Sequence, residues 1–413
     1  MTQPAGSLAW RYLENLTEML PHRASASEHE KRAAKWLGDQ LSSIGYGVKT
    51  EPFYAPRDTL YVGPPIVFLG VLLGASIGLV WPWVGILLTV LVVLPMVGDM
   101  LGRPWNFDLL LNLFASRNVV ARWGGGGETP PGEEPPHDEE PPRIIVMAHY
   151  DTQKGSLLFH PRFAPFIMPL FTAAYGAIGL VPVCLLLHWI WPNAAWPQLV
   201  LMAAGAVLLA VAAFLTLSRW TGRYINGAND NGSGTAVALS LARRLAESDR
   251  PWREQVTFVF TGSEEVGERG ALAYFKAHRG TLAREDLRVV NLDNIGGGHL
   301  HYLQGEGMVG YQAYDPGLLH LAEQRAALAE PGMLTPVKNL LLPTDGLIAM
   351  ANGYRAITFI AMDDEGRIPH YHWHTDVLEN IDRDLLEKEE ELLWQYLNDA
   401  AQEAGPRSAG NRS

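Results

Sequence analysis

Five clusters of polar residues contain the side chains best suited to bind a divalent metal. In chain order they are His149-Tyr150-Asp151, Asn229-Asp230-Asn231, Glu264-Glu265, Asp293 in Asn-Leu-Asp-Asn, and the late histidines His370, His372 and His374. Imidazole and carboxylate ligands without any thiolate suit zinc, cobalt or manganese. Five such ligands are too many for one tetrahedral ion that keeps an open position, so the set predicts two ions that share a bridging carboxylate.

The adjacent pair Glu264-Glu265 is the most informative cluster. One carboxylate can bind a metal while its neighbour takes a proton from a metal-bound water. Each cluster alone also has an ordinary structural interpretation, such as a turn, a helix cap, a solvated face or a packed loop. The chemical interpretation therefore depends on all five clusters converging on one place.

The elements that must position these clusters alternate along the charged parts of the chain. The patterns predict strands at 48–53, 118–122, 143–148, 255–261, 288–292 and 355–361, and helices at 10–20, 28–44, 234–246, 272–278, 344–351 and 383–401. This alternation predicts an α/β fold with a mostly parallel, mixed central sheet flanked by helices. Ligands bind outside the carboxyl ends of strands in such sheets. Four of the five clusters follow a strand or open a helix, so they can converge there.

Two long apolar blocks interrupt this pattern. Residues 59–98 and 163–218 contain no Asp, Glu, Lys or Arg, although mean hydropathy over the whole chain is near zero. Each block can cross a bilayer twice, since one helical span needs about 20 apolar residues. Breaks at Trp81-Pro82-Trp83 and at 188–198 predict two transmembrane hairpins, four helices in all. The alternative is a pair of buried hairpins in a soluble core.

The charged flanks of these blocks predict an orientation. Arginines flank both hairpins, at Arg57, Arg103, Arg117, Arg122, Arg162, Arg219 and Arg223, whereas the tips carry no Lys or Arg. The bias of positive charge toward the cytoplasm places every polar segment on that side. We expect a multi-pass integral membrane protein, for example of a bacterial plasma membrane. The first fifty residues lack the pattern of a signal peptide.

The insertions divide the chain into predicted segments. We expect the α/β domain at 1–60, 106–162 and 221–404, the hairpins at 61–105 and 163–220, and a disordered tail at 405–413. An acidic Pro/Gly loop at 124–142 supplies about half of the net charge of −12, so this charge does not indicate a partner. The absence of a basic stripe argues against nucleic acid. A single cysteine, Cys184, excludes an intrachain disulfide. The oligomeric state stays open.

The order and spacing of the clusters resemble those of the M28 zinc aminopeptidases, which have a dinuclear site. The steps of 35 residues from Asp230 to Glu265 and of 28 residues to Asp293 agree with the family, as does the opening segment LPHRASASEHEKRAAKWLGDQLSSIGY at 20–46. The resemblance covers about 1–60, 106–162 and 221–400. The family differs in lacking the second apolar block between the first two clusters.

The resemblance implies a role for each matching residue. The implied metal ligands are His149, Asp230, Glu265, Asp293 and His372. Asp230 would bridge the two ions, Asp151 would orient His149 from behind, and Glu264 would be the general base. Counting back from Asp376 selects His372 as the last ligand, with His374 as the alternative. Thr344-Asp345-Gly346 resembles a family segment near the substrate pocket.

The implied function is a membrane-anchored zinc aminopeptidase with two Zn²⁺ ions, for which Co²⁺ or Mn²⁺ could substitute. It would hydrolyse the N-terminal bond of peptides through a metal-bridging water, close to the lipid bilayer. Alternatives are carboxypeptidase or glutaminyl cyclase chemistry on the same fold, a non-catalytic membrane scaffold, and a transporter. A scaffold is expected to have lost ligands, and a transporter to carry intramembrane charges. The residue removed, the physiological substrate and the native metal stay open.

Overall fold

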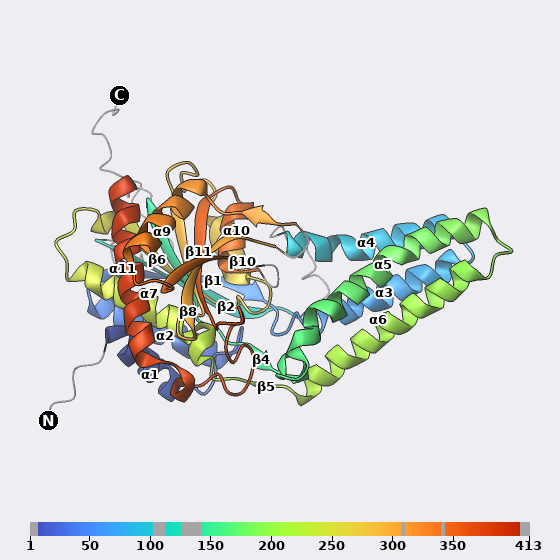
Figure 1. Cartoon of the computed structure of the whole chain (residues 1–413), viewed down its shortest axis with the longest axis horizontal. Coiled ribbons are helices and arrows are strands. Elements are labelled where there is room, and N and C mark those ends of the chain that lie inside the picture. Colours follow the sequence, from blue (N-terminus) through green and yellow to red (C-terminus); the bar gives the residue numbers. More distant parts are fainter. Residues whose placement is uncertain (1–6, 102–111, 125–141, 308–309, 340–342, 405–413) are drawn as a thin grey trace. The chain divides into compact units, whose positions relative to one another are not determined.

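The computed structural model describes residues 7–101, 112–124, 142–307, 310–339 and 343–404. The chain forms two compact units, which are drawn in Figure 1. The first comprises Met1–Arg57, Leu113–Gln153 and Tyr224–Ser413, and the second comprises Asp58–Asn112 and Lys154–Arg223. The predicted disordered tail at 405–413 and nearly all of the predicted acidic loop at 124–142 lie outside the described residues.

The first unit is built on a nine-stranded sheet. Its strands are β1 (Tyr46–Ala55), β2 (Phe114–Trp123), β3 (Ile144–His149), β6 (Val256–Thr261), β7 (Arg288–Asp293), β8 (His299–Glu306), β9 (Gln312–Ala313), β10 (Leu334–Asn339) and β11 (Arg355–Met362). The order is β1-β2-β6-β3-β7-β11-β8-β10, with β9 beside β8. The short strands β4 (Lys154–Gly155) and β5 (Arg223–Tyr224) form a separate sheet.

The large sheet is mixed, although less parallel than the sequence predicts. Its centre, from β6 through β3 and β7 to β11, is parallel, and β10 is parallel to β8. The pairs β1-β2, β2-β6, β8-β11 and β8-β9 are antiparallel. Among the described residues the two kinds of pair are therefore balanced, and the expectation of a mostly parallel sheet is wrong. Periodicity within a strand carries no information about the direction of its neighbours.

Helices cover both faces of this sheet because successive strand residues point to opposite sides. In β3, Ile144 and Val146 join one core and Ile145 and Met147 join the other. The first core holds residues of α1 (Leu8–Met19), α2 (Glu28–Ser43), α7 (Gly234–Ala246), α9 (Pro316–Leu328) and α11 (Arg383–Ala404). The second holds residues of α8 (Arg269–Ala277) and α10 (Asp345–Ala351).

The parallel centre gathers the polar clusters at one edge. β3 ends at His149, β6 ends shortly before Glu264, and β7 ends at Asp293. The segment Ala228–Ser233, which leads into α7, is bound to the same edge. The Thr235 hydroxyl donates to the His149 carbonyl at 2.7 Å, and Asn231 Nδ2 donates to the Leu292 carbonyl at 2.8 Å.

Four elements between β7 and α10 were not expected from the sequence, namely β8, β9, β10 and α9. The start of α9 carried a readable signal, because Asp315 caps the helix by accepting from the Leu318 N–H at 3.0 Å and Pro316 opens it. β8 and β10 lie among glycine-rich and proline-rich stretches that obscure their alternation.

The second unit consists of four apolar helices in two pairs, which form around the predicted breaks. They are α3 (Gly63–Gly78), α4 (Pro82–Met100), α5 (Ile167–Ile190) and α6 (Trp196–Thr221). Glycines let α3 and α4 meet backbone to backbone. A Cβ built on Gly85 would lie 2.4 Å from both the Gly74 carbonyl oxygen and Gly78 Cα. Close approach through small residues is typical of helices that pack in lipid.

The helices of the second unit differ in length. Among the described residues, Ala164–Ile190 and Trp196–Thr221 are long and apolar enough to cross a membrane, whereas Gly63–Gly78 and Pro82–Gly98 are shorter. Sixteen residues of α3 rise only about 24 Å, less than the roughly 30 Å hydrocarbon core. Helix length therefore supports two spanning helices rather than the four that were predicted.

Candidate metal centre

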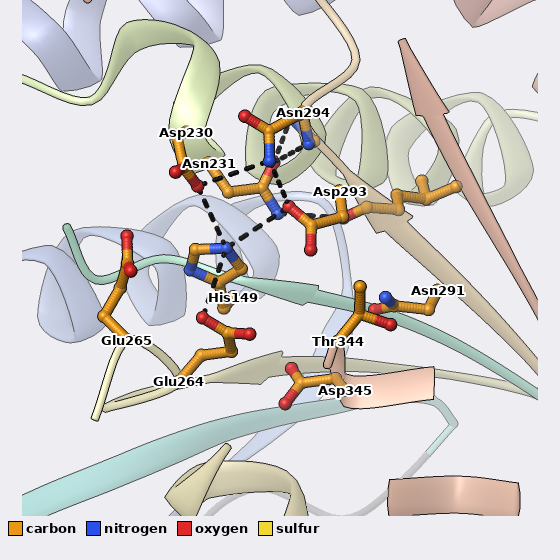
Figure 2. Close-up of polar contacts among 12 residues, drawn as sticks. His149, Asp230, Asn231, Glu264, Glu265, Asn291, Asp293, Asn294, Thr344 and Asp345 are labelled. Atoms are coloured by element: carbon orange, nitrogen blue, oxygen red, sulfur yellow. Dashed lines mark hydrogen bonds and ion pairs between the residues drawn. The ribbon is translucent and has the colours of Figure 1, made fainter. Parts of the chain in front are cut away.

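The predicted cluster residues meet at the carboxyl edge of the parallel strands. Figure 2 shows His149, Asp230, Glu264, Glu265 and Asp293 directed toward a common space. Together with His372 their side chains are between 3 and 9% exposed. Buried carboxylates and imidazoles at this density need compensating charge or hydrogen bonds.

Asp230 lies between two histidines. Its Oδ1 is 3.4 Å from His149 Nε2, and its Oδ2 is 2.9 Å from His372 Nε2. Asp293 Oδ1 is 3.4 Å from His149 Nε2, and Glu265 Oε2 is 3.0 Å from His372 Nε2. Two groups of three potential ligands result, each with its ligand atoms within 4.8 Å of one another, and both groups contain Asp230. This is the arrangement expected of a carboxylate that bridges two ions.

Glu264 belongs to neither of these two groups. Its Oε2 is 3.8 Å from His149 Nε2, and it forms a third group of potential ligands with His149 and Glu265. Its carboxylate therefore borders the space between the candidate ligands. That position suits a group that exchanges a proton there.

Asp151 connects the first cluster to the glutamate pair. Its Oδ1 is 3.5 Å from His149 Nδ1 and accepts from the Glu264 N–H at 2.9 Å. Its Oδ2 accepts from the Ser25 hydroxyl at 2.6 Å and from the Glu265 N–H at 3.3 Å. Asp151 thus lies behind His149, where the resemblance placed it, and also holds the backbone of both glutamates.

The late loop brings His372 into the centre and leaves the other two histidines outside. His374 is exposed, and His370 Nδ1 is bonded to the Thr375 hydroxyl at 2.7 Å. Asp376 anchors this loop, because its Oδ1 and Oδ2 accept from the N–H groups of Asn229 and Asp230 at 2.6 and 3.0 Å. The loop with His372 is thereby tied to the backbone of Asp230.

Asp345 lies next to Glu264 in Figure 2, on the side away from Glu265. It accepts a hydrogen bond from the Thr261 hydroxyl, and its Oδ1 is buried with no hydrogen-bond partner among the described residues. Burial raises its pKa to about 7. The preceding residue, Thr344, donates its hydroxyl to buried Glu306 at 3.0 Å. The segment 344–346 thus lies beside the cluster, and its proximity to a substrate pocket stays a prediction.

Arg23 is a contributor that the sequence did not reveal. This fully buried side chain donates Nε to the Tyr150 carbonyl at 2.6 Å, and its terminal nitrogens to the carbonyls of Asn226 and Gly227, each at 2.7 Å. Burial lowers its pKa to about 10 against the opposing effect of four site carboxylates. A single arginine in a short loop carries no sequence signal of burial.

Tyr371 is a second such residue. Its ring stacks on His372 with centroids 3.8 Å apart. Burial, and after it the negative charges of Asp230 and Glu265, raise the pKa of its phenol well above the ordinary value. The hydroxyl therefore stays protonated at neutral pH. Its position next to His372 was the available signal.

The electrostatics of the centre are those of crowded acids. Burial raises the pKa of Glu264 well above its usual value and that of Glu265 to about 7. Burial lowers the pKa of His372, but Glu265 and Asp230 outweigh it and raise this pKa to about 10. In the same way, Glu264 and three other nearby carboxylates outweigh burial and raise the pKa of His149. The two histidines hold the pKa of Asp230 well below its usual range, although burial opposes them.

These residues fit divalent cations. The ligand atoms are imidazole nitrogens and carboxylate oxygens, which zinc accepts, and Glu265 Oε1 is buried with no hydrogen-bond partner among the described residues. Cations would compensate the excess of acidic groups, whose negative charges raise the pKa of both imidazoles.

A family model matches much of this region. Residues 208–397 match Peptidase family M28. The matched range contains four of the candidate ligands and Glu264, and His149 precedes it. A curated relative, the alkaline phosphatase isozyme conversion protein of Escherichia coli (strain K12), is 38% identical over 74 residues. That alignment covers 18% of this chain and 21% of the relative, so the chain matches about a fifth of that protein's length.

Solved structures share the fold. Glutaminyl cyclase of Porphyromonas gingivalis is similar with a TM-score of 0.55 and 16% identity, over 95% of this chain and 97% of that one. A zinc aminopeptidase from Bacillus subtilis gives 0.52 and 14%, over 95 and 94%. An aminopeptidase of Legionella pneumophila gives 0.53 and 12%, over 95 and 71%. The chain thus has the mixed α/β fold of zinc aminopeptidases and of a glutaminyl cyclase.

Proposed function

We propose that this chain is a membrane-anchored metallopeptidase of the M28 family that uses two zinc ions to remove N-terminal residues from peptides. The observation that carries the proposal is the position of Asp230. Its two oxygens face different histidines, and each histidine is accompanied by a further carboxylate, Asp293 on one side and Glu265 on the other. The match to Peptidase family M28 over residues 208–397 supports the same reading.

Each group in the centre then has a defined role. His149, Asp293 and Asp230 would hold one ion, and Glu265, His372 and Asp230 the other; when bound, the ions would polarise the scissile carbonyl and acidify the attacking water. Asp151 would keep the His149 ring oriented. A carboxylate of the cluster would bind the free α-amine of the substrate, which selects for N-terminal residues.

Glu264 is the proposed general base. It would accept a proton from the attacking water and pass it to the leaving amine. Burial raises the pKa of its carboxyl, which brings its proton affinity closer to that needed near neutral pH. Tyr371, whose phenol keeps its proton, would donate a hydrogen bond to the oxygen on which negative charge develops.

The second unit is the proposed membrane anchor. Its helices α5 and α6 are long enough to span, and Trp189, Trp191 and Trp196 are about half exposed near the turn between them. Tryptophan at such a turn suits a membrane interface. The shorter pair α3 and α4 would accompany them by thinning the bilayer locally. By the arginine bias the peptidase unit would lie in the cytoplasm.

A second candidate is cyclisation of N-terminal glutamine, because a glutaminyl cyclase is among the chains that share the fold over nearly their whole length. The two activities yield different products. A peptidase releases a free amino acid, whereas a cyclase releases ammonia from a peptide that begins with Gln and leaves the peptide bond intact.

One experiment tests the proposal. Zinc-loaded protein purified in detergent is assayed on aminoacyl-p-nitroanilides and on a Gln-initiated peptide, beside Glu264→Gln with its zinc content measured. We expect amino-acid release that falls about 10²–10⁴-fold in the variant while zinc is retained. Ammonia release alone would favour the cyclase, and equal activity in the variant would exclude Glu264 as the base.

A further inference from the structure

Two residues of the segment 149–153 form hydrogen bonds with the Glu264-Glu265 pair. Asp151 accepts the N–H groups of Glu264 and Glu265 at 2.9 and 3.3 Å. Gln153 Nε2 donates to the Glu265 carbonyl at 2.9 Å and to Glu265 Oε2 at 3.1 Å. The two ends of Glu265 are therefore held by residues only two positions apart in the sequence.

The bond from Gln153 acts directly on a candidate metal ligand. Glu265 Oε2 lies 3.0 Å from His372 Nε2 as well as 3.1 Å from Gln153 Nε2. One amide group binds both the backbone and the carboxylate of Glu265, so the torsions between them are restricted. A glutamate side chain otherwise loses much rotamer freedom when it binds. The amide is neutral, so it orients the carboxylate without neutralising it.

The neighbouring glutamate is not held in this way. Its backbone N–H is bound by Asp151, and among the described residues no hydrogen bond from a side chain to the Glu264 carboxylate is found. The two carboxylates of the pair are chemically identical, and their surroundings separate them. Glu265 is oriented toward His372, whereas no comparable hydrogen bond fixes the Glu264 carboxylate among the described residues.

Gln153 itself is firmly placed. It is 8% exposed, and its carbonyl accepts from the Ile225 N–H at 3.3 Å. The residue before it, Thr152, accepts the Arg23 N–H with its hydroxyl at 2.9 Å. The amide is therefore fixed from the backbone side before it reaches Glu265.

We propose that Gln153 is a positioning residue that commits Glu265, rather than Glu264, to the metal centre. This inference rests on the proposed function, because it assigns Glu265 to an ion. It predicts that loss of the amide lowers the affinity for the ion held by Glu265 and His372. The affinity for the ion held by His149 and Asp293 should stay nearly unchanged.

The test measures metal binding rather than turnover alone. Full-length Gln153→Met, which keeps side-chain length without a donor, and Gln153→Glu, which places one carboxylate against another, are titrated with Zn²⁺ and Co²⁺ against a competing chelator. Thermal unfolding without added metal is followed in parallel. Gln395→Met is the matched control, because Gln395 Nε2 also donates to a glutamate, Glu391, at 3.0 Å on the outer helix α11.

We expect one of two binding steps to weaken about 10–100-fold in Gln153→Met. The loss should be larger in Gln153→Glu, and the control should match the wild type. The Co²⁺ d–d spectrum should change for that step only, and excess zinc should restore the lost peptidase activity. Gln153→Asn, which keeps the amide on a shorter chain, should bind metal more tightly than Gln153→Met.

Several outcomes would overturn the proposal. It fails if the affinities of both binding steps in Gln153→Met equal those of the wild type. It also fails if the variant that loses affinity is equally destabilised against thermal unfolding in the absence of metal, because the fold as a whole would then be weakened. If the wild type binds two ions and the variants bind them equally well, Gln153 has no positioning role, but the proposed function still stands. A wild-type protein that binds no zinc removes both.

Discussion

The two units of the molecule differ in which side chains they keep from water. The sheet unit buries acidic groups, among them Asp151 at 0%, Asp230 at 2% and Glu306 at 0% exposure. The helical unit exposes large apolar groups, among them Leu73 at 59% and Met202 at 71%. Buried acids need partners, and exposed apolar surface needs a cover that is not water. The first unit therefore keeps acidic groups inside, and the second exposes an apolar surface.

The units also differ in how their elements approach each other. In the sheet unit, buried aromatic and branched side chains fill the space between helices and strands. In the helical unit, α3 and α4 approach until Gly85 meets the backbone of Gly74 and Gly78. Substitutions at the buried acids of the sheet unit should therefore act through charge and hydrogen bonding, and substitutions at the glycines of the helical unit through steric bulk.

The largest expected effect is the loss of the shared carboxylate. Asp230→Ala should abolish tight binding of both ions, because both ligand groups contain Asp230. Activity should fall by more than the roughly 10–100-fold that loss of an outer partner causes. Metal analysis after dialysis measures the stoichiometry. Loss of one ion only would show that Asp230 serves a single ion.

Removal of the buried cation should come next. Arg23→Met leaves three backbone carbonyls without their donor and several carboxylates without a nearby positive charge. Breaking such a buried network should destabilise the fold by about 3–5 kcal/mol. Urea unfolding measures this, with Arg383→Met, at a surface ion pair with Glu387, as the control. Equal midpoints for the two variants would contradict the structural role of Arg23.

A steric change in the helical unit should cost less stability than the loss of Arg23, and it should leave zinc binding unaffected. Gly85→Val places a side chain where a Cβ alone would lie 2.4 Å from backbone atoms, and overpacking of this kind costs about 1–3 kcal/mol. Gly176→Val, whose Cβ meets nothing within 4 Å, is the matched control. Thermal unfolding in detergent should fall for the first variant only. Zinc affinity of the sheet unit should stay unchanged in both, and a parallel loss would show that the units depend on one another.

The sequence predicted where the candidate ligands lie better than it predicted the residues that contact them. His149, Glu264 and Asp293 follow strands whose patterns were clear, so their convergence could be expected from the rule for parallel strand ends. The family resemblance favoured His372 over His374 as the last ligand, and His372 is the histidine that lies beside Asp230. Arg23, Gln153 and Tyr371 could not be assigned, because their roles depend on contacts between segments far apart in the chain.

The strand pairing and the membrane insertion show two other limits. The antiparallel edges and β8 depend on partners, which a strand pattern does not name. The apolar blocks predicted helices at the right places, but charge-free length alone did not separate α5 and α6, which are long enough to span a membrane, from the shorter α3 and α4. Whether a helix is long enough to cross a membrane depends on its own length between the turns, not on the length of the whole apolar block.

The last expected effect is a pH dependence carried by one buried acid, spread over several pH units. Glu306 accepts hydrogen bonds from Tyr314 and Thr344, and burial raises its pKa from 4.5 to about 8. Between about pH 4.5 and 8 the folded protein keeps this proton and the unfolded chain loses it. Stability from this group is therefore complete below the lower value and falls as pH rises, by at most about 1.4 kcal/mol per pH unit. The free energy of unfolding, measured with urea at several values between pH 5 and 8, should fall less steeply with pH in Glu306→Gln than in the wild type. In Glu391→Gln, at an exposed site, this slope against pH should equal that of the wild type. An unchanged slope in Glu306→Gln would mean that this carboxyl is ionised in the fold, and that the sheet unit tolerates an interior charge even away from its metal centre.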